Sequence, residues 1–534
     1  MTLCTVRLME TGDRRVLGHV RQVQWRRGHF GRLSGVRGCK GRHSGKQGEK
    51  HRDTLSFPTF APVVFSSILF LLYFLPVFLL VYTLAPASWR NAVLLAFSTV
   101  FYAWGAPVFV FVLLASTVID FYIVRSLHLA SAPKKRKGWL LLSLGMNLGL
   151  LAYFKYANFF VDNLNAALTA AGINAIGWTA VALPIGISFY TFQTLTYSID
   201  VYRREMKPLE RVSDYLVYIL SFPQMIAGPI VRFQEVASQL RERVTLPEDQ
   251  LIGFVRFALG LAKKVFIANV LGAEADRIFG LEDTPDLATA WLGAISYAGQ
   301  IYFDFAGYSD MAIGLGRMMG FRFPENFNSP YVAANITDFW RRWHITLGRW
   351  MRDYLYIPLG GNRVGSKARL YFNLWVVFLL SGLWHGASWN FVIWGAYHGL
   401  FLILDRLFLA RWTERIGRWP AAFLTCFIVI IGWVFFRIDT FGEAIHYLSA
   451  MFRGSWAGLP ESSSKFWWTL GASLLASWAV LIPLGRRAER MLYPTEFADW
   501  RIALPYLIIA LLTYALACAV ITGQGFNPFI YFRF

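Results

Sequence analysis

His385 stands inside a long uncharged stretch of this chain. Residues 370–404 contain no Asp, Glu, Lys or Arg, and His385 lies among them between Trp384 and Gly386. Glycines at 382 and 386 would let a helix or a ligand approach the backbone closely. Burial favours the uncharged imidazole, which is the form that acts as a general base at neutral pH. A structural histidine that bonds across helices is the alternative, and these residues alone do not separate the two.

A second polar island spans residues 300–363. Asp304 and Asp310 lie there within otherwise apolar helical sequence. A charge at the centre of a membrane helix costs about 2.5–3.5 kcal/mol on insertion scales, so such residues usually face an internal cavity. One interpretation is the substrate path of a transporter or flippase, formed by these carboxylates and the nearby arginines.

The pattern from residue 337 onward predicts a helix that lies along the membrane interface. Its apolar positions are three and four residues apart, which defines one helical face: Trp340, Trp343, Leu347, Trp350, Met351 and Tyr354. Thr337 or Asp338 would cap the start of this helix. His344 borders the apolar face and is predicted to point inward. Arg341, Arg349 and Arg352 fall away from that face, where they could instead anchor the helix to lipid phosphates.

Composition indicates what kind of protein must position these residues. The chain has 534 residues, of which 16% are charged and 56% are hydrophobic, with a net charge of +20. Ordinary soluble domains are about 25% charged, and disorder requires low hydrophobicity. Four cysteines without a CxxC motif or a Cys/His cluster exclude a disulfide scaffold and predict no metal site. The composition therefore predicts an all-α polytopic integral membrane protein.

Apolar stretches predict roughly 11–13 membrane helices, because a bilayer core of ~30 Å requires about 20 apolar residues. The run of basic residues at 134–137 marks a cytoplasmic loop. Neither the alternation of an outer-membrane barrel nor the two-half symmetry of many transporters is visible. Residues 1–56 carry thirteen Lys or Arg and four Asp or Glu, and no signal-peptide core. We expect residues 1–62 to be a disordered basic extension or a start assigned too early, and residues 63–534 to be the membrane domain, with its core motifs in 300–400.

Two long segments resemble the membrane-bound O-acyltransferase (MBOAT) family, and most closely its bacterial AlgI-type branch, which acetylates alginate. These segments are PENFNSPYVAANITDFWRRWHITLGRWMRDYLYIPLGGNR (324–363) and LWHGASWNFVIWGAYHG (383–399). Further matches follow the order of the family, among them VFSSILFLLYFLP (64–76), YFKYANFF (153–160) and FPQMIAGPIVRF (222–233). The resemblance implies an MBOAT-type fold, in which membrane helices with interfacial or re-entrant helices surround a central tunnel.

The resemblance also implies site residues. The catalytic histidine of the family falls on His385, as the general base, and a second conserved polar position falls on His344. His344 would stabilise the oxyanion or orient the base, with Asn373 a weaker candidate. The expected acyl donor is cytoplasmic acetyl-CoA, a substrate and not a bound cofactor. Judged by charge alone, four arginines could bind the phosphates of coenzyme A: Arg341, Arg342, Arg349 and Arg352.

The AlgI-type branch implies passage of acetyl across the bacterial inner membrane to periplasmic proteins of the AlgJ, AlgX and AlgF type. The product would be an O-acetylated exopolysaccharide, with the mannuronate of alginate as the expected acceptor. The same module occurs with other acceptors, including cellulose and D-alanylated teichoic acid. A transporter or flippase, or a scaffold subunit of a polysaccharide export complex, remains the alternative. No nucleic-acid partner is expected.

Overall fold

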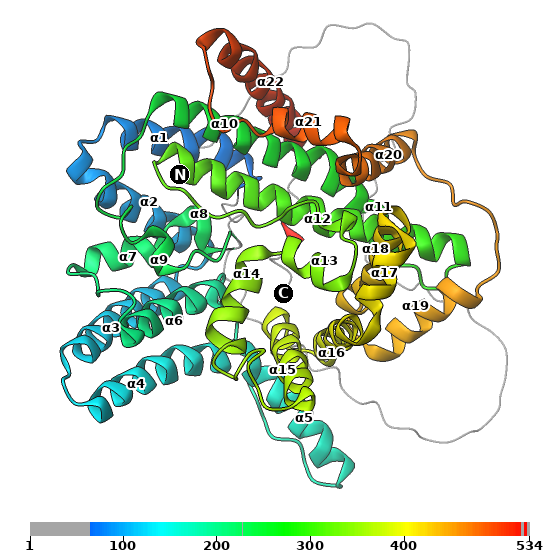
Figure 1. Cartoon of the computed structure of the whole chain (residues 1–534), viewed down its shortest axis with the longest axis horizontal. Coiled ribbons are helices and arrows are strands. Elements are labelled where there is room, and N and C mark those ends of the chain that lie inside the picture. Colours follow the sequence, from blue (N-terminus) through cyan, green and yellow to red (C-terminus); the bar gives the residue numbers. More distant parts are fainter. Residues whose placement is uncertain (1–64, 227, 525–527, 531–534) are drawn as a thin grey trace, which may run out of the picture. The chain divides into compact units, whose positions relative to one another are not determined.

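The computed structural model describes residues 65–226, 228–524 and 528–530. The described residues all fall within one unit of the chain, Thr59–Phe534. The predicted extension at residues 1–62 lies outside the described residues. Within the described part, all regular structure is helical and no strand occurs (Figure 1). The all-α prediction is therefore confirmed.

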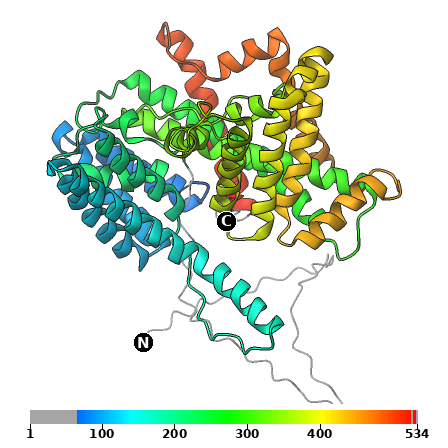
Figure 2. The same ribbon diagram turned by 60° about the horizontal axis from the view of Figure 1, so that its bottom comes forward.

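The first helices are α1 (Leu75–Leu84), α2 (Arg90–Gly105), α3 (Phe109–Leu129), α4 (Pro133–Leu151), α5 (Ala157–Ala170), α6 (Ile187–Arg203), α7 (Val212–Leu220), α8 (Phe222–Met225) and α9 (Phe233–Val236). The middle of the chain forms α10 (Pro247–Ala262), α11 (Asn269–Phe279), α12 (Leu287–Met318), α13 (Ile336–Arg342), α14 (Ile345–Met351), α15 (Lys367–His385) and α16 (Trp389–Leu404). The last helices are α17 (Ala410–Ile416), α18 (Arg418–Arg437), α19 (Phe441–Arg453), α20 (Ser464–Trp478), α21 (Pro483–Leu492) and α22 (Trp500–Gln524). Several helices continue through a short π-helical turn, as α4 does at Ala152–Tyr156 before α5, which projects away from the other helices (Figure 2).

Five helical stretches among the described residues are long and apolar enough to cross a bilayer. They are Phe109–Leu129, Pro133–Ala170, Trp389–Ile416, Arg418–Arg437 and Trp500–Gly523, and the bent pair α20–α21 would make a sixth. This number is below the 11–13 predicted. The difference arises because some predicted segments fold as shorter helices, such as the 9-residue α7. Others carry charges that are buried against protein, as α12 does.

The centre of the fold is α12, a single helix of 32 residues with nearly every side chain buried. The apolar pattern of the sequence predicts two separate segments here, 287–303 and 307–320, whereas the structure forms one continuous helix. Helices α10, α11, α18 and α19 pack around α12 (Figure 1). Glycines bring α10 and α12 close together, since a Cβ at Gly260 would lie 2.5 Å from the carbonyl oxygen of Gly307.

Two apolar clusters meet at the helices that carry the candidate histidines. The larger cluster includes Trp350 and Trp384, together with much of the chain before residue 240. The second cluster includes Trp343, Trp394 and Phe436. Since Phe378 packs against both clusters, α13–α16 lie along the boundary between them.

Glycines also set the separation of α15 and α16. A Cβ at Gly382 would overlap the carbonyl oxygen of Phe391, and one at Gly395 would overlap that of Phe378. We therefore expect Gly382→Ala to destabilise the fold by about 1–3 kcal/mol through overpacking. Thermal unfolding of the detergent-solubilised protein should show a lower Tm. The matched control is Gly145→Ala in α4, where a Cβ would meet nothing within 4 Å; an equal loss in both variants would contradict this account.

Candidate active site

His344 lies at a break between two short helices. The predicted interfacial helix is interrupted there, because α13 ends at Arg342 and α14 begins at Ile345, with His344 in the left-handed region at φ 44°. The loop before α13 takes over the backbone hydrogen bonds: Asn328 N donates to Arg342 O at 3.0 Å, and Ile345 N donates to Asn326 O at 2.9 Å. The prediction of one continuous helix was therefore wrong.

The predicted cap of that helix was also wrong. Asn335, and neither Thr337 nor Asp338, caps α13, since its side-chain oxygen accepts from Asp338 N at 2.8 Å. Thr337 instead donates its backbone N–H to Asp405 at 2.7 Å. The predicted inward direction of His344 is confirmed, because its side chain is buried.

A network centred on Asn326 determines which nitrogen of His344 carries the proton. The side-chain oxygen of Asn326 accepts from Thr346 N at 3.3 Å and from Thr346 Oγ1 at 2.9 Å. The Asn326 amide nitrogen donates to Ser309 Oγ at 3.0 Å. His344 Nδ1 lies 3.1 Å from the same Asn326 oxygen, so Nδ1 must be the donor. In the neutral ring Nε2 is then an acceptor, and it has no hydrogen-bond partner among the described residues.

His385 is the last residue of α15, and its ring is buried among aromatic rings. The ring centroids of Trp384, Trp394 and Phe436 lie 4.9, 5.1 and 5.3 Å from that of His385. His344 also packs against Trp384, with the ring centroids 6.1 Å apart. The structure thus brings the two predicted histidines to the same tryptophan.

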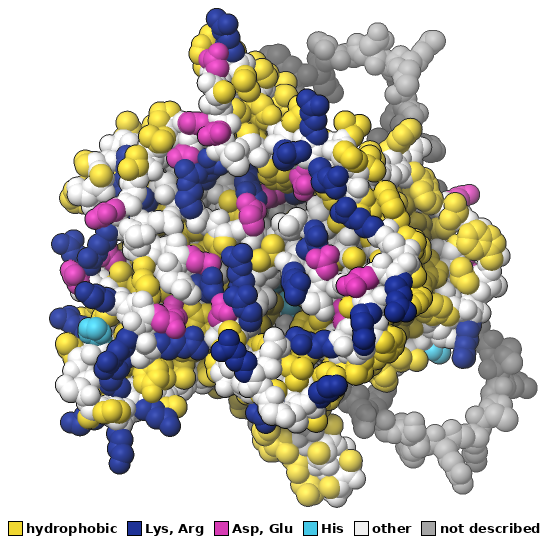
Figure 3. Space-filling model, viewed as in Figure 1, with side chains coloured by type: hydrophobic (Ala, Val, Ile, Leu, Met, Phe, Trp, Pro, Cys, Tyr) yellow, Lys and Arg dark blue, Asp and Glu magenta, His cyan; other side chains and the backbone are white. Residues whose placement is uncertain are grey.

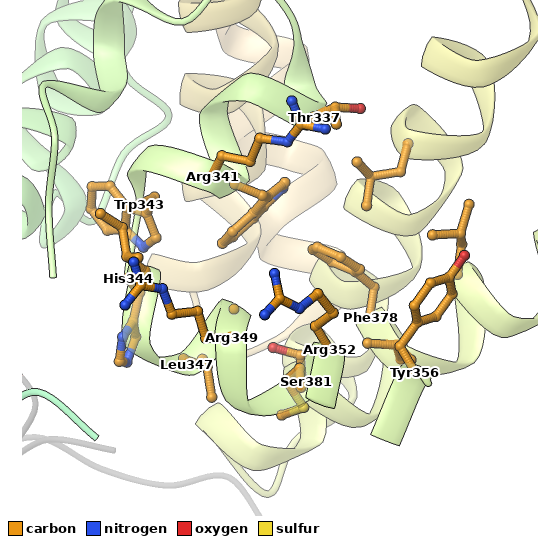
Figure 4. A pocket seen from close by; sticks show the side chains of 17 residues that line it. Thr337, Arg341, Trp343, His344, Leu347, Arg349, Arg352, Tyr356, Phe378 and Ser381 are labelled. Carbon is orange, nitrogen blue, oxygen red and sulfur yellow. The ribbon is translucent and has the colours of Figure 1, made fainter. Parts of the chain in front are cut away.

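A cavity of about 440 Å³ opens on the His344 side of this pair. Its walls combine apolar side chains such as Trp340 and Phe378 with polar ones. Figure 4 shows Arg341, Arg349 and Arg352 around this cavity together with His344. Arg342 does not line it and pairs with Asp338 at 2.9 Å. Three of the four predicted arginines therefore share a cavity with one predicted histidine.

A second cavity, also of about 440 Å³, begins at the residue after His385. Gly386, Ala387 and Ser388 line it, with Lys155 and Arg437 from other helices. The two cavities share no lining residue, and the Trp384–His385 pair lies between His344, which lines the first, and Gly386, which lines the second. His385 itself lines neither cavity: its ring packs against Trp384, which contacts His344 of the first cavity, and the next residue, Gly386, lines the second.

The weaker candidate Asn373 has a structural role, whereas neither ring nitrogen of His398 has a hydrogen-bond partner among the described residues. Asn373 donates to the carbonyl oxygens of Leu359 and Gly361, at 3.2 and 3.4 Å, and so holds the loop before α15. His398 is fully buried with its ring edge-on to Trp340. No group of three His, Cys, Asp or Glu that could hold a metal ion occurs within the described residues.

Asp304 and Asp310 are held in buried ion pairs. Asp304 pairs with Lys264 at 2.5 Å, and both side chains are nearly inaccessible to solvent. Asp310 pairs with Lys263 at 2.7 Å and with Arg256 at 2.9 Å. These ion pairs join α10 and its π-helical extension to α12. Asp310 also lines a cavity of about 480 Å³, together with its partners Lys263 and Arg256.

Two residues near the histidines were missed by the sequence analysis. Asn326 lies in the PENFNSP loop, and its role depends on a loop fold that periodicity does not reveal. Lys155 lies in the YFKYANFF segment, where a lone charge in an apolar stretch was the available signal. Its ammonium contacts the backbone at His385.

Comparisons with known proteins identify the family of this chain. Residues 210–438 match the profile of MBOAT, the membrane-bound O-acyltransferase family. The chain is 42% identical to the protein named "Probable alginate O-acetylase AlgI" of Azotobacter vinelandii, over 88% of this chain and 100% of that protein. It is 36% identical to the peptidoglycan O-acetyltransferase of Helicobacter pylori, over 73% of this chain and 80% of the relative. It is 31% identical to the teichoic acid D-alanyltransferase of Bacillus subtilis, over 48% of this chain and 67% of the relative.

This chain therefore belongs to the membrane-bound O-acyltransferase family. It is a multi-pass membrane protein and an O-acyltransferase. The resemblance noted in the sequence is confirmed.

Proposed function

We propose that this protein transfers acetyl from cytoplasmic acetyl-CoA to a hydroxyl group, with His385 as the general base. The observation that supports this most directly is the buried imidazole of His385, which packs against Trp384 beside the arginine-lined cavity and directly precedes Gly386 of the second cavity. The acyl donor would enter the first cavity and the acceptor the second. Apolar aromatic walls around His385 would keep water from hydrolysing the thioester.

The transfer proceeds by proton removal and acyl substitution. His385 takes the proton of the acceptor hydroxyl as its oxygen attacks the thioester carbonyl. The new C–O bond forms, the C–S bond breaks, and the leaving thiolate takes the proton from the imidazolium. Of the two roles considered for His344, we assign it that of orienting the base. Its Nε2 is a hydrogen-bond acceptor in the neutral ring, whereas an oxyanion is stabilised by donors.

The arginine-lined cavity suits the phosphates of coenzyme A. Basic side chains gather on the face seen in Figure 3, which is the face on which α13 and α14 lie in Figure 1. An excess of basic residues is typical of cytoplasmic surfaces of membrane proteins. Arg349 and Arg352 are exposed at the cavity, where charge-assisted hydrogen bonds to phosphate would form.

We expect Arg352→Ala to raise the KM for acetyl-CoA about tenfold, since a lost phosphate contact is worth about 1.4 kcal/mol or more. The kcat should change little, because the guanidinium would not contact the reacting atoms. Steady-state release of CoA measures both constants. Arg363→Ala, an exposed arginine that does not line the cavity, is the control. An unchanged KM in Arg352→Ala would argue against this placement of the donor.

The relatives named as alginate O-acetylases support alginate as the final acceptor. We place the protein in the bacterial inner membrane because the proposed donor, acetyl-CoA, is cytoplasmic. A cavity of about 440 Å³ has the size of a small-molecule site, far below that of a polymer. We therefore propose that periplasmic proteins of the AlgJ, AlgX and AlgF type receive the acetyl group and place it on mannuronate. Relatives named for peptidoglycan and teichoic acid make those polymers the alternative acceptors.

The decisive experiment uses the purified protein in lipid nanodiscs with acetyl-CoA labelled in the acetyl group. We expect free CoA to appear when the acceptor or a periplasmic partner is added, together with labelled acceptor. Mannuronate oligomers, cello-oligomers and the partner proteins are tested separately to identify the acceptor. A transporter or scaffold would leave acetyl-CoA intact under all of these conditions.

A further inference from the structure

The last turn of α15 is held by two adjacent side chains from the junction of α4 and α5. Lys155 lies in the π-helical turn Ala152–Tyr156, and its ammonium donates to the carbonyl oxygens of Trp384 and, at 3.2 Å, of His385. It also donates to Ser188 Oγ at 3.2 Å. The neighbouring Tyr156 hydroxyl donates to the carbonyl oxygen of Leu383 at 2.8 Å. Three consecutive carbonyl groups, ending with that of His385, are thereby bound.

These contacts match what the end of a helix requires. The last four carbonyl groups of an α-helix have no partner within the helix. A positive charge at that end is stabilised by the partial negative charge of those carbonyls. The next residue, Gly386, is extended, so α15 stops directly after His385. Without the donors of Lys155 and Tyr156, the carbonyl groups of this turn would have no hydrogen-bond partner, and we expect the turn that carries His385 to unwind.

Lys155 forms no salt bridge with a carboxylate among the described residues, although it is buried. Buried lysines are rare unless they are paired, and in membrane proteins they usually mark a function. Here the hydrogen bonds of the ammonium go to the backbone at Trp384 and His385 and to one serine hydroxyl. Lys155 also lines the second cavity, directly beside Gly386.

We propose that Lys155 is a positioning residue for acyl transfer: its ammonium, aided by the Tyr156 hydroxyl, fixes the last turn of α15 and thereby the direction of the His385 imidazole. This inference rests on the proposed role of His385. Lys155 itself does not react, and it acts through the backbone that carries the base. The π-helical turn supplies the geometry, because it directs two successive side chains to successive carbonyls of another helix.

The test compares Lys155→Met with wild type in nanodiscs. Methionine keeps the volume of the side chain and removes the donors. We expect kcat for CoA release to fall at least thirtyfold, while the KM for acetyl-CoA stays within twofold, because the arginine-lined cavity is untouched. Tyr156→Phe removes only the bond to Leu383 and should lower kcat about threefold. Lys367→Met, an exposed lysine at the opposite end of α15, is the control and should match wild type.

Hydrogen–deuterium exchange provides a readout that does not depend on activity. Amides of residues 383–386 should exchange at least tenfold faster in Lys155→Met than in wild type, with a smaller increase in Tyr156→Phe. Exchange elsewhere in α15 should be unchanged. Unaltered exchange at 383–386, or a wild-type kcat in Lys155→Met, would overturn the proposal. If Lys155→Met does not fold, kcat and the amide exchange of residues 383–386 are measured in Tyr156→Phe instead, and wild-type values of both would overturn the proposal.

The exchange experiment also separates this proposal from the proposed function. If the wild-type protein releases no CoA under any condition, the acetyltransferase assignment fails. Faster exchange in Lys155→Met would still show that Lys155 holds the last turn of α15. Conversely, an active wild type with unaltered exchange in the variants would leave the acetyltransferase intact and remove Lys155 from its machinery.

Discussion

His385→Gln is expected to lower kcat for CoA release about 10³-fold, within the range of about 10²–10⁴ that general acid–base catalysis contributes. Glutamine fills similar space and can still hydrogen-bond, but its amide does not accept a proton from the acceptor hydroxyl. The aromatic walls of Trp384, Trp394 and Phe436 should hold either side chain in place. Steady-state kinetics with labelled acetyl-CoA and acceptor measure the effect.

His446→Gln is the matched control for that experiment. His446 is an exposed histidine on α19, away from both cavities, so its loss should leave kcat unchanged. The thermal stability of His385→Gln should lie close to that of wild type, so that the lost rate is a loss of chemistry. Normal acetyl transfer by folded His385→Gln would remove this residue from the mechanism and leave the base unassigned.

His344→Gln is expected to lower kcat about 10²-fold, the second largest effect of a single substitution at this site. The variant loses the basic nitrogen Nε2, since a glutamine amide oxygen accepts hydrogen bonds but does not take up a proton, while the network of Asn326, Thr346 and Ser309 can still form. KM for acetyl-CoA should stay within twofold, because the arginines and the apolar walls of the first cavity are retained. The comparison of kcat with KM therefore distinguishes support of the base from binding of the donor.

Asn326→Asp refines this second prediction. A carboxylate facing Nδ1 would favour the doubly protonated imidazolium and convert Nε2 from an acceptor into a donor. If His344 acts as an acceptor, Asn326→Asp should lose activity nearly as strongly as His344→Gln. Activity equal to or above that of wild type in Asn326→Asp would instead favour the oxyanion role for His344 that the sequence alone left open.

Composition and motif were sufficient for the class of the protein, because both depend on residue types. The uncharged stretch around His385 predicts that this histidine is buried, and its side chain is buried in the structure. The periodicity around His344 correctly placed its side chain inward but did not reveal the break at that residue. The break depends on hydrogen bonds from the loop at Asn326 and Asn328, which lie almost twenty residues earlier in the chain. Pattern analysis within one helix does not detect such bonds.

The number of membrane helices was predicted less well for a related reason. Hydropathy treats each apolar segment as facing lipid, whereas α10 and α12 face other helices and carry paired charges. Lys155 was missed because its partners are backbone carbonyls at Trp384 and His385, and backbone atoms leave no signature in side-chain sequence. Residue types can be read from the sequence, but contacts between residues far apart in the chain cannot, and these contacts decide both cases.

The ion pair between Lys264 and Asp304 has a consequence for how this protein reaches the bilayer. Either charge alone would oppose lateral release of its segment from the insertion machinery, by about 2.5–3.5 kcal/mol. Joined at 2.5 Å, the two charges neutralise one another. We therefore expect the ribosome to have synthesised residue 304 before the segment around residue 264 leaves the translocon, so that both segments enter the lipid as a preassembled hairpin.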